Sequence, residues 1–94
     1  MWKLRYADSV VHEDIARLDP TVRRRIRKSI ESKLTTDPLR FGKPLRHSLH
    51  HLRCLRVGNY RVLYHVDHDA QFVSIVSIGH RRDIYMKYKV AGLE

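Results

Sequence analysis

Two arginines, Arg56 and Arg61, flank a dipeptide that is suited to a tight turn. Residues 52–66 read LRCLRVGNYRVLYHV, and Gly58-Asn59 between two apolar runs predicts a β-hairpin with a two-residue loop. Pairing outward from this loop sets the two arginines directly across from each other. Because like charges facing each other destabilise a sheet by up to roughly 1 kcal/mol, the pair suggests an anion bound between the guanidinium groups. The alternative, in which both long side chains extend into water, remains open.

The two faces of this hairpin differ in character, because side chains alternate between the faces of a strand. One face has Arg53 as its only charge and otherwise carries Leu55, Val57, Tyr60, Val62, Tyr64 and Val66. The other face carries Leu52, Cys54, Arg56, Arg61, Leu63 and His65. We therefore expect the first face to cover the hydrophobic core and the second to carry the anion site.

The composition predicts one small, strongly basic domain. The chain has 94 residues, with 19 Lys plus Arg against 10 Asp plus Glu, a formal net charge of +9. A chain of this length builds one hydrophobic core, so we expect a single domain over residues 1–94. The positive charge indicates a polyanion or an acidic protein as partner.

The sequence is typical of a cytoplasmic protein without a membrane segment. No apolar run approaches the roughly 20 residues that a membrane span needs. Residues 1–9, MWKLRYADS, do not resemble a signal peptide. Cys54 is the single cysteine, so no internal disulfide can form, which fits a reducing compartment.

The N-terminal third predicts a strand and two helices. Residues 2–6 alternate between apolar and charged side chains, which indicates a half-buried strand. Asp8 or Ser9 can cap a short helix that ends near Leu18, and Asp19-Pro20 is a strong start for a longer one. The apolar stripe of the short helix is Val11, Ile15 and Leu18, and that of the longer helix is Val22, Ile26, Ile30 and Leu34.

The second helix also carries the cations Arg23, Arg24, Arg25, Arg27 and Lys28. Cations early in a helix oppose its dipole, by roughly a few tenths of a kcal/mol each. Their number suggests contact with nucleic acid or the ribosome, although a solvated helix face explains them equally well.

Residues 39–51 follow neither the helical nor the strand period and contain Gly42 and Pro44, so we expect a loop leading to the hairpin. Its histidines are His47, His50 and His51. A His-x-x-His spacing can bind zinc on a helix, but the chain has only one cysteine, Cys54, and the acidic residues are elsewhere. We therefore predict no metal site.

The C-terminal third predicts the central strand. Residues 72–78, FVSIVSI, form a nearly continuous apolar run, which is typical of a strand covered on both faces. We expect the strand to run out over residues 80–85, before a short tail with one more helical turn or strand over residues 86–94. The whole order predicts an α+β fold, β-α-α-β-β-β, in which two N-terminal helices pack on one face of an antiparallel sheet.

The alternation also assigns faces in this strand. A regular four-residue turn at residues 67–70 places Ser74, Val76, Ile78 and His80 on the face of Arg56 and Arg61. Arg81 then points to the other face, unless Gly79 allows a bulge or the strand ends there.

Two motifs carry a resemblance to a known family. They are R-V-G-N-Y-R-V-L-Y at residues 56–64 and G-H-R-R-D-I-Y at residues 79–85. The chain thereby resembles the RelE/ParE superfamily of bacterial type II toxins, whose usual form is close to R-x-R-x-G-D-Y-R-x-x-Y followed by G-H-R-x-x-x-Y. Asp37-Pro38 and Leu45 also fall where family members have a comparable dipeptide and leucine.

Members of the RelE branch are mRNA endonucleases that act in the ribosomal A site and use no metal. The resemblance implies that Arg61, Arg81 and Tyr85 are catalytic and that Arg56 is a basic strand position. At one position the chain departs from the pattern. Where family nucleases commonly have a second basic residue it has Cys54, and Arg53 is displaced to the neighbouring position and so to the other face.

An enzyme of this kind needs no external nucleophile, because the 2′-OH of RNA attacks the phosphate. Guanidinium groups keep their proton under physiological conditions and bind phosphate oxygens bidentately, so we assign Arg56, Arg61 and Arg81 to the phosphate. Arg53 and Arg82 are further candidates for contacts with nucleic acid.

Two residues are candidates for moving protons or contacting a base. His80 is the more natural proton carrier, provided that it faces the cleft. Tyr85 can serve as a base only where neighbouring cations favour its ionised form, and otherwise it can stack on a base or orient the ribose. No cofactor is expected.

Two alternatives to the nuclease remain. A ParE-like inhibitor of DNA gyrase cuts no RNA and lacks this nuclease site, and a degenerate member would only bind an antitoxin or nucleic acid as part of a repressor. Cys54 leaves room for both. The implied partner in each case is an acidic, partly disordered antitoxin that folds a helix or strand over the basic cleft, and the nuclease would also bind mRNA and the ribosome.

Overall fold

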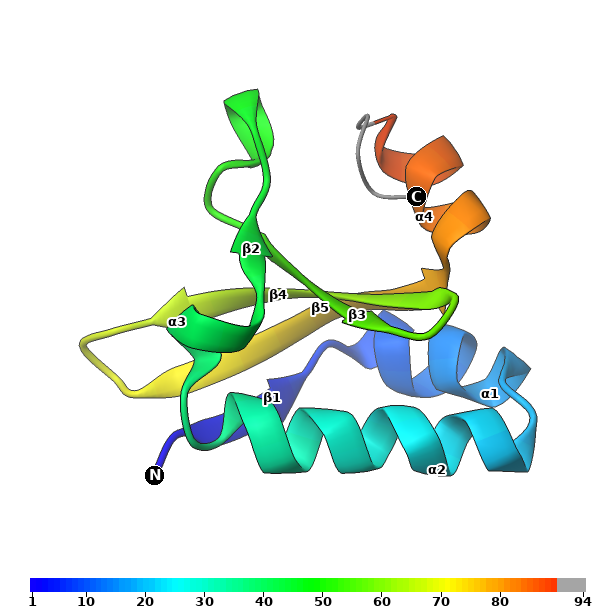
Figure 1. The fold of residues 1–94 in the computed structure, drawn as a ribbon, viewed down its shortest axis with the longest axis horizontal. Coiled ribbons are helices and arrows are strands. Elements are labelled where there is room, and N and C mark those ends of the chain that lie inside the picture. Colours follow the sequence, from blue (N-terminus) through cyan, green and yellow to red (C-terminus); the bar gives the residue numbers. More distant parts are fainter. Residues whose placement is uncertain (90–94) are drawn as a thin grey trace.

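The computed structural model describes residues 1–89 and has a five-stranded sheet at its centre (Figure 1). The strands are β1 (Lys3–Tyr6), β2 (Lys43–Pro44), β3 (Arg53–Val57), β4 (Tyr60–Asp67) and β5 (Phe72–His80). Their order in the sheet is β1-β5-β4-β3-β2. The predicted meander β3-β4-β5 is antiparallel, whereas β1 pairs with β5 in parallel. The α+β class is therefore confirmed, and the sheet is mostly rather than entirely antiparallel.

Two N-terminal helices cover one face of this sheet (Figure 1). The first consists of η1 (Val10–Asp14) and α1 (Ile15–Arg17), and the second of α2 (Pro20–Ser29) and η2 (Ile30–Leu34). The predicted cap of the second helix is confirmed, because the Asp19 carboxylate accepts the backbone N–H groups of Thr21 at 3.0 Å and Val22 at 3.1 Å. The core beneath them includes Ile26, Ile30, Leu34, Leu55, Val62, Tyr64, Val73 and Ile75.

The apolar stripe predicted for the first helix is wrong at Val11. The backbone N–H of Ile15 bonds to the carbonyl oxygen of Val10, five residues earlier, so this turn is a π-helical turn with extra residues. The wider turn rotates Val10 into the core, where its exposed fraction is 0%, and leaves Val11 46% exposed. A spacing rule based on 3.6 residues per turn does not apply across such a turn.

The expected loop after the second helix contains short ordered elements. They are α3 (Pro38–Phe41), β2 and η3 (His47–Leu49). The Tyr64 hydroxyl donates to the carbonyl oxygen of Pro38 at 2.6 Å, and a Cβ on Gly42 would lie only 1.9 Å from that hydroxyl oxygen. Gly42 is therefore required for this segment to lie against the sheet.

The predicted hairpin and its register are confirmed. Val57 pairs with Tyr60 and Arg56 pairs with Arg61 across β3 and β4. Gly58 has a φ of 59°, whereas Asn59 is not among the described residues with positive φ. The loop therefore follows the pattern in which only the first central residue needs the left-handed region.

The faces predicted for the end of β5 are wrong, because the pairing of β4 with β5 shifts by one residue between Leu63 and Tyr64. This bulge leaves Val76 without a directly paired residue, so the residues after it change faces. Ile78 pairs with Val62 and His80 with Tyr60, on the face that the N-terminal helices cover.

The chain after β5 forms a helix, α4 (Arg81–Tyr88), where an extended chain end was expected over residues 80–85. This helix stands on the opposite side of the sheet from α2 (Figure 1). Its Ile84 joins a second apolar cluster with Leu45, Leu52, Cys54 and Leu63. Of the predicted tail at residues 86–94, residues 86–88 belong to α4, and residues 90–94 lie outside the described residues. No helix within residues 1–89 is long and apolar enough to cross a membrane.

Candidate functional site

Arg56, Arg61 and Arg81, hereafter the arginine cluster, come together at the hairpin end of the sheet. Arg56 on β3 lies directly across from Arg61 on β4, and Arg61 is paired on its other side with Gly79 on β5. Burial lowers the pKa of Arg61, and the positive charges of Arg56 and Arg81 lower it further. The three guanidinium groups are therefore close enough for their charges to interact.

Arg61 is held by the turn that precedes it. Its side chain is almost fully buried, with 1% exposed. Nη1 donates to the carbonyl oxygen of Gly58 at 3.0 Å and to that of Tyr60 at 2.9 Å. These bonds fix the orientation of the guanidinium group, and charge-assisted bonds to backbone carbonyls offset part of the cost of burying it.

Arg81 is placed by the start of α4. Its backbone N–H donates to the carbonyl oxygen of Asn59 at 2.8 Å, which ties the helix to the hairpin turn. A Cβ on Gly79 would lie 3.4 Å from two side-chain atoms of Ile84, so glycine allows α4 to pack closely over the end of β5. The sequence alone did not establish how Arg81 reaches the face of Arg61. In the structure, β5 ends at His80 and α4 begins at Arg81, and this change of backbone direction brings Arg81 to that face.

Tyr85 and Arg82 also lie on α4. Tyr85 is four residues after Arg81, so the two side chains are neighbours on one side of the helix. Tyr85 is 38% exposed and Arg82 is exposed. Arg81, Arg82 and Tyr85 can therefore all be reached by a large ligand.

His80 does not join the arginine cluster. It pairs with Tyr60, and the two rings meet edge to face with centroids 5.6 Å apart. Its Nδ1 accepts the backbone N–H of Arg82 at 3.2 Å, so the imidazole caps α4. His80 lines a hollow of about 220 Å³ together with Asp14 and Asp83, on a different side from Arg61.

Arg53 is also separated from the cluster. Its Nη2 donates to the carbonyl oxygens of Leu39 at 2.7 Å and Gly42 at 2.6 Å. The guanidinium group thereby anchors α3 to the sheet beside Tyr64, with which Arg53 pairs across the strands. The geometry gives Arg53 a structural position, away from the phosphate site that the sequence suggested.

Cys54 lies beside the arginine cluster and is buried among Leu45, Leu63 and Ile84. Burial raises the pKa of its thiol to about 11, although the charges of Arg61 and Arg56 act in the opposite direction. The thiol is therefore protonated at neutral pH, and this position contributes neither a positive charge nor a base.

The loop histidines lie near one another at the opposite end of the hairpin from its turn. The rings of His50 and His51 are 6.1 Å apart, and those of His51 and His65 are 6.3 Å apart. Within residues 1–89, no group of three or more His, Cys, Asp or Glu side chains has an arrangement that could hold a metal ion.

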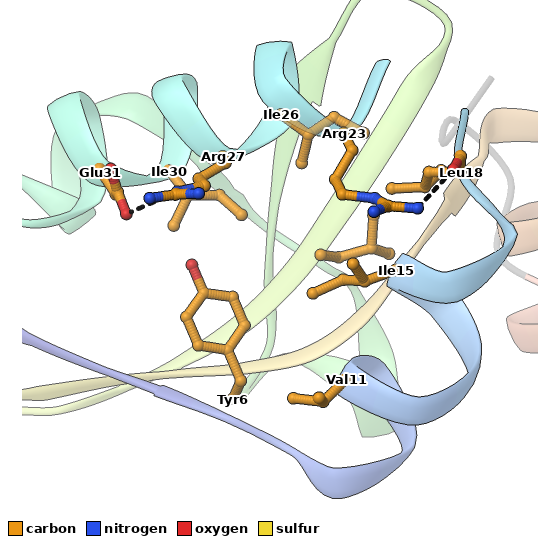
Figure 2. Close-up of a pocket in the computed structure, with 10 residues that line it drawn as sticks. Tyr6, Val11, Ile15, Leu18, Arg23, Ile26, Arg27, Ile30 and Glu31 are labelled. Atoms are coloured by element: carbon orange, nitrogen blue, oxygen red, sulfur yellow. Dashed lines mark hydrogen bonds and ion pairs between the residues drawn. The ribbon is translucent and has the colours of Figure 1, made fainter. Parts of the chain in front are cut away.

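An apolar groove opens between the two N-terminal helices (Figure 2). It encloses about 390 Å³. The apolar residues that line it are Val11, Ile15, Leu18, Ile26, Ile30 and Ile78. Arg23 and Arg27 lie along one side, where Arg23 donates to the carbonyl oxygen of Leu18 at 3.0 Å and Arg27 pairs with Glu31 at 3.3 Å. Sequence reasoning missed this groove, because it forms only where two helices meet.

Comparison with known proteins places this architecture in a family. Residues 7–85 match the family model described as the ParE toxin of a type II toxin-antitoxin system, parDE. Toxin RelG of Mycobacterium tuberculosis is 34% identical over 79 residues, which cover 84% of this chain and 91% of the relative.

Two solved structures share the fold. A chain of the toxin-antitoxin complex RelBE2 from Mycobacterium tuberculosis has a TM-score of 0.79 and 30% identity, covering 84% of this chain and 96% of that one. The isolated E. coli RelE toxin has a TM-score of 0.71 and 18% identity, covering 95% and 96%, which is a likeness of fold alone. The family match over most of the chain and the relative at 34% identity show that this protein belongs to the RelE/ParE superfamily of type II toxin-antitoxin toxins.

Proposed function

We propose that this toxin is an mRNA endonuclease that acts on the ribosome, with the RNA 2′-OH as nucleophile and no metal ion. The arginine cluster is the observation that carries this proposal. Arg61 is buried and fixed by backbone carbonyls, and Arg56 and Arg81 bring further positive charge to the same face. Such a site favours a bound phosphate, whose negative charge relieves the repulsion among the cations.

In this mechanism the 2′-oxygen forms a bond to phosphorus and the bond from phosphorus to the 5′-oxygen breaks. A proton leaves the 2′-OH and another reaches the departing 5′-oxygen. Arg61 and Arg56 hold the phosphate oxygens, and Arg81 stabilises the charge that develops in the transition state. Preorganised cations of this kind cost no reorganisation during the reaction.

Tyr85 is the residue on this side of the sheet to which we assign proton transfer or orientation of the ribose. It is exposed on α4, one helical turn beyond Arg81. His80 is not used, because its Nδ1 caps α4 and its ring packs on Tyr60. Cys54 is not used either, since burial keeps its thiol protonated.

The partner that we propose is an antitoxin with an acidic amphipathic helix that lies in the groove between the N-terminal helices. The groove has an apolar floor, and Arg23 and Arg27 lie on one side together with Glu31, which pairs with Arg27 (Figure 2). The apolar floor beside these two cations matches a helix with apolar and acidic faces. The likeness to a chain of the RelBE2 toxin-antitoxin complex supports such a partner. The sequence predicts that the antitoxin covers the basic cleft, and a partly disordered chain can cover both surfaces.

Translation of a defined message, followed by primer extension, tests the proposed activity. The wild-type protein should produce cuts within the message, and Arg56→Ala and Arg81→Ala should reduce them by at least roughly tenfold, which is the loss of one charge-stabilising donor. Both arginines are exposed, so these variants should fold, and Arg61→Lys tests the buried position without removing its charge. Lys3→Ala, also exposed but on the edge strand β1, is the control. No cleavage by the wild type, or equal cleavage by all variants, would contradict the proposed nuclease activity.

Inhibition of DNA gyrase is the second candidate, and Cys54 is the observation that favours it. Its protonated thiol stands where nucleases of the family commonly have a basic residue. A supercoiling assay separates the two functions, because a ribosome-dependent nuclease leaves gyrase untouched.

A further inference from the structure

One basic residue of α2 lies against the hairpin turn at the arginine cluster. A Cβ built on Gly58 would lie 2.7 Å from Nη2, 2.8 Å from Nη1 and 2.9 Å from Cζ of Arg25. These distances are shorter than real Cβ contacts, so the guanidinium group of Arg25 packs directly on the Cα side of this glycine. Arg25 thus reaches from a helix on one face of the sheet to the turn whose carbonyl groups bind Arg61 and Arg81.

This turn is the common support of the candidate site. The carbonyl oxygens of Gly58 and Tyr60 accept Nη1 of Arg61, and that of Asn59 accepts the backbone N–H of Arg81. Three consecutive carbonyl groups therefore set the position of Arg61 and the start of α4. A small displacement of the turn would move Arg61 and Arg81 relative to each other.

The turn itself is exposed at Gly58 and Asn59, and glycine permits many backbone conformations. Exposed loop tips of this kind open readily unless another group packs against them. Arg25 supplies such a group, since its planar guanidinium covers the one residue of the turn that has no side chain.

We propose that Arg25 is a positioning residue, which packs on Gly58 to hold residues 58–60 and thereby fixes Arg61 and Arg81 for phosphate binding. It touches no reacting atom. The consequence for cleavage rests on the proposed nuclease function, whereas the consequence for the turn does not. Glycine at position 58 has two roles here, because it adopts a φ of 59° and leaves room for Arg25.

Hydrogen exchange of the Arg81 backbone amide, measured by NMR, tests whether Arg25 holds the turn, without any assay of activity. Arg25→Ala should speed this exchange by roughly tenfold, because the bond to Asn59 then opens more often. Arg25→Lys should not restore the slow rate, since an ammonium group lacks the planar surface. Arg24→Ala, the neighbouring position on α2, should behave as the wild type. Equal exchange in the wild type and Arg25→Ala overturns the proposal.

Kinetics then separate positioning from direct RNA contact. Arg25→Ala should lower kcat for cleavage by roughly tenfold with little change in KM, because misplaced groups lose transition-state stabilisation. A rise in KM that Arg25→Lys restores would instead identify a phosphate contact and overturn the positioning role. If the wild type cuts no RNA, the proposed function fails, and the exchange result still decides whether Arg25 holds the turn.

A double-mutant comparison gives an independent check. Gly58→Asn adds a Cβ where the guanidinium group of Arg25 lies and should displace this flexible side chain from the turn. In that background Arg25→Ala should no longer change the exchange of the Arg81 amide, as expected for residues in contact. An equal effect of Arg25→Ala in both backgrounds would contradict the packing.

Discussion

Arg56 and Arg61 face each other across β3 and β4, with Arg61 buried and Arg56 exposed. Backbone carbonyls fix the buried cation, and the exposed cation lies at the surface, where a ligand can reach it. Charges of equal sign at such positions destabilise the folded protein. The pair is therefore a place where binding and stability are expected to conflict.

Arg56→Ala should make the protein more stable while it weakens RNA cleavage. Removing one of two facing cations should raise the free energy of unfolding by up to about 0.5 kcal/mol, whereas loss of a phosphate contact should cost at least roughly tenfold in cleavage. Urea unfolding and primer extension on the same preparation measure both. A destabilised variant with normal cleavage would show that the pair is structural.

Sulfate should stabilise the protein through the arginine cluster. An anion that binds only the folded state raises the melting temperature by mass action, here by about 3 °C or more at tens of millimolar sulfate. Sodium chloride at equal ionic strength is the salt control. The shift should shrink in Arg81→Ala and persist in Arg24→Ala, and an equal shift in both would place the anion elsewhere.

The stability of the protein should fall between about pH 9 and pH 11 through Cys54. Burial raises the pKa of this thiol from 9.0 to about 11, so over this range the unfolded chain loses a proton that the folded chain keeps. The stabilisation is complete below pH 9 and is lost as the pH rises toward 11, by up to about 2 kcal/mol. Urea unfolding against pH measures it.

Cys54→Ala is the control for that series, because it removes the titrating group. Burial also raises the pKa values of Tyr6 and Tyr64, and these groups are present in both proteins. The difference between the two curves therefore isolates the thiol. A constant difference from pH 8 to pH 11 would contradict the predicted burial effect.

Gly42→Ala should be strongly destabilising, because the added Cβ would meet the ring and hydroxyl group of Tyr64. Overpacking of this kind costs about 3 kcal/mol. Tyr64→Phe should cost only about 1 kcal/mol, since it removes the hydrogen bond to the Pro38 carbonyl but keeps the ring. Chemical unfolding compares them, and similar losses for both would show that α3 can move away.

Val11→Glu should weaken binding of the antitoxin that we propose for the groove. The substitution places a negative charge on its apolar floor, where Val11 is 46% exposed and so can change without loss of the core. Leu39→Glu, at a site that is 41% exposed outside the groove, is the matched control. Calorimetry with the antitoxin encoded beside the toxin gene measures binding, and equal affinity of the two variants would place the antitoxin elsewhere.

The sequence by itself determined the hairpin and the start of α2, because both depend on residues that are close together in the chain. Gly58-Asn59 between two alternating runs fixed the pairing of Arg56 with Arg61, and Asp19-Pro20 marked the start of α2. Turn and cap preferences act over a few residues, so the sequence contains all the information that they need.

Only the tertiary structure decided which residues share the site. One extra residue in β5 moved His80 to the face of Tyr60, and the start of α4 brought Arg81 toward Arg61. Alternation along a strand cannot reveal a bulge, because one inserted residue reverses every later side chain. The packing of Arg25 on Gly58 joins elements that are distant in sequence, and no local pattern could have predicted it.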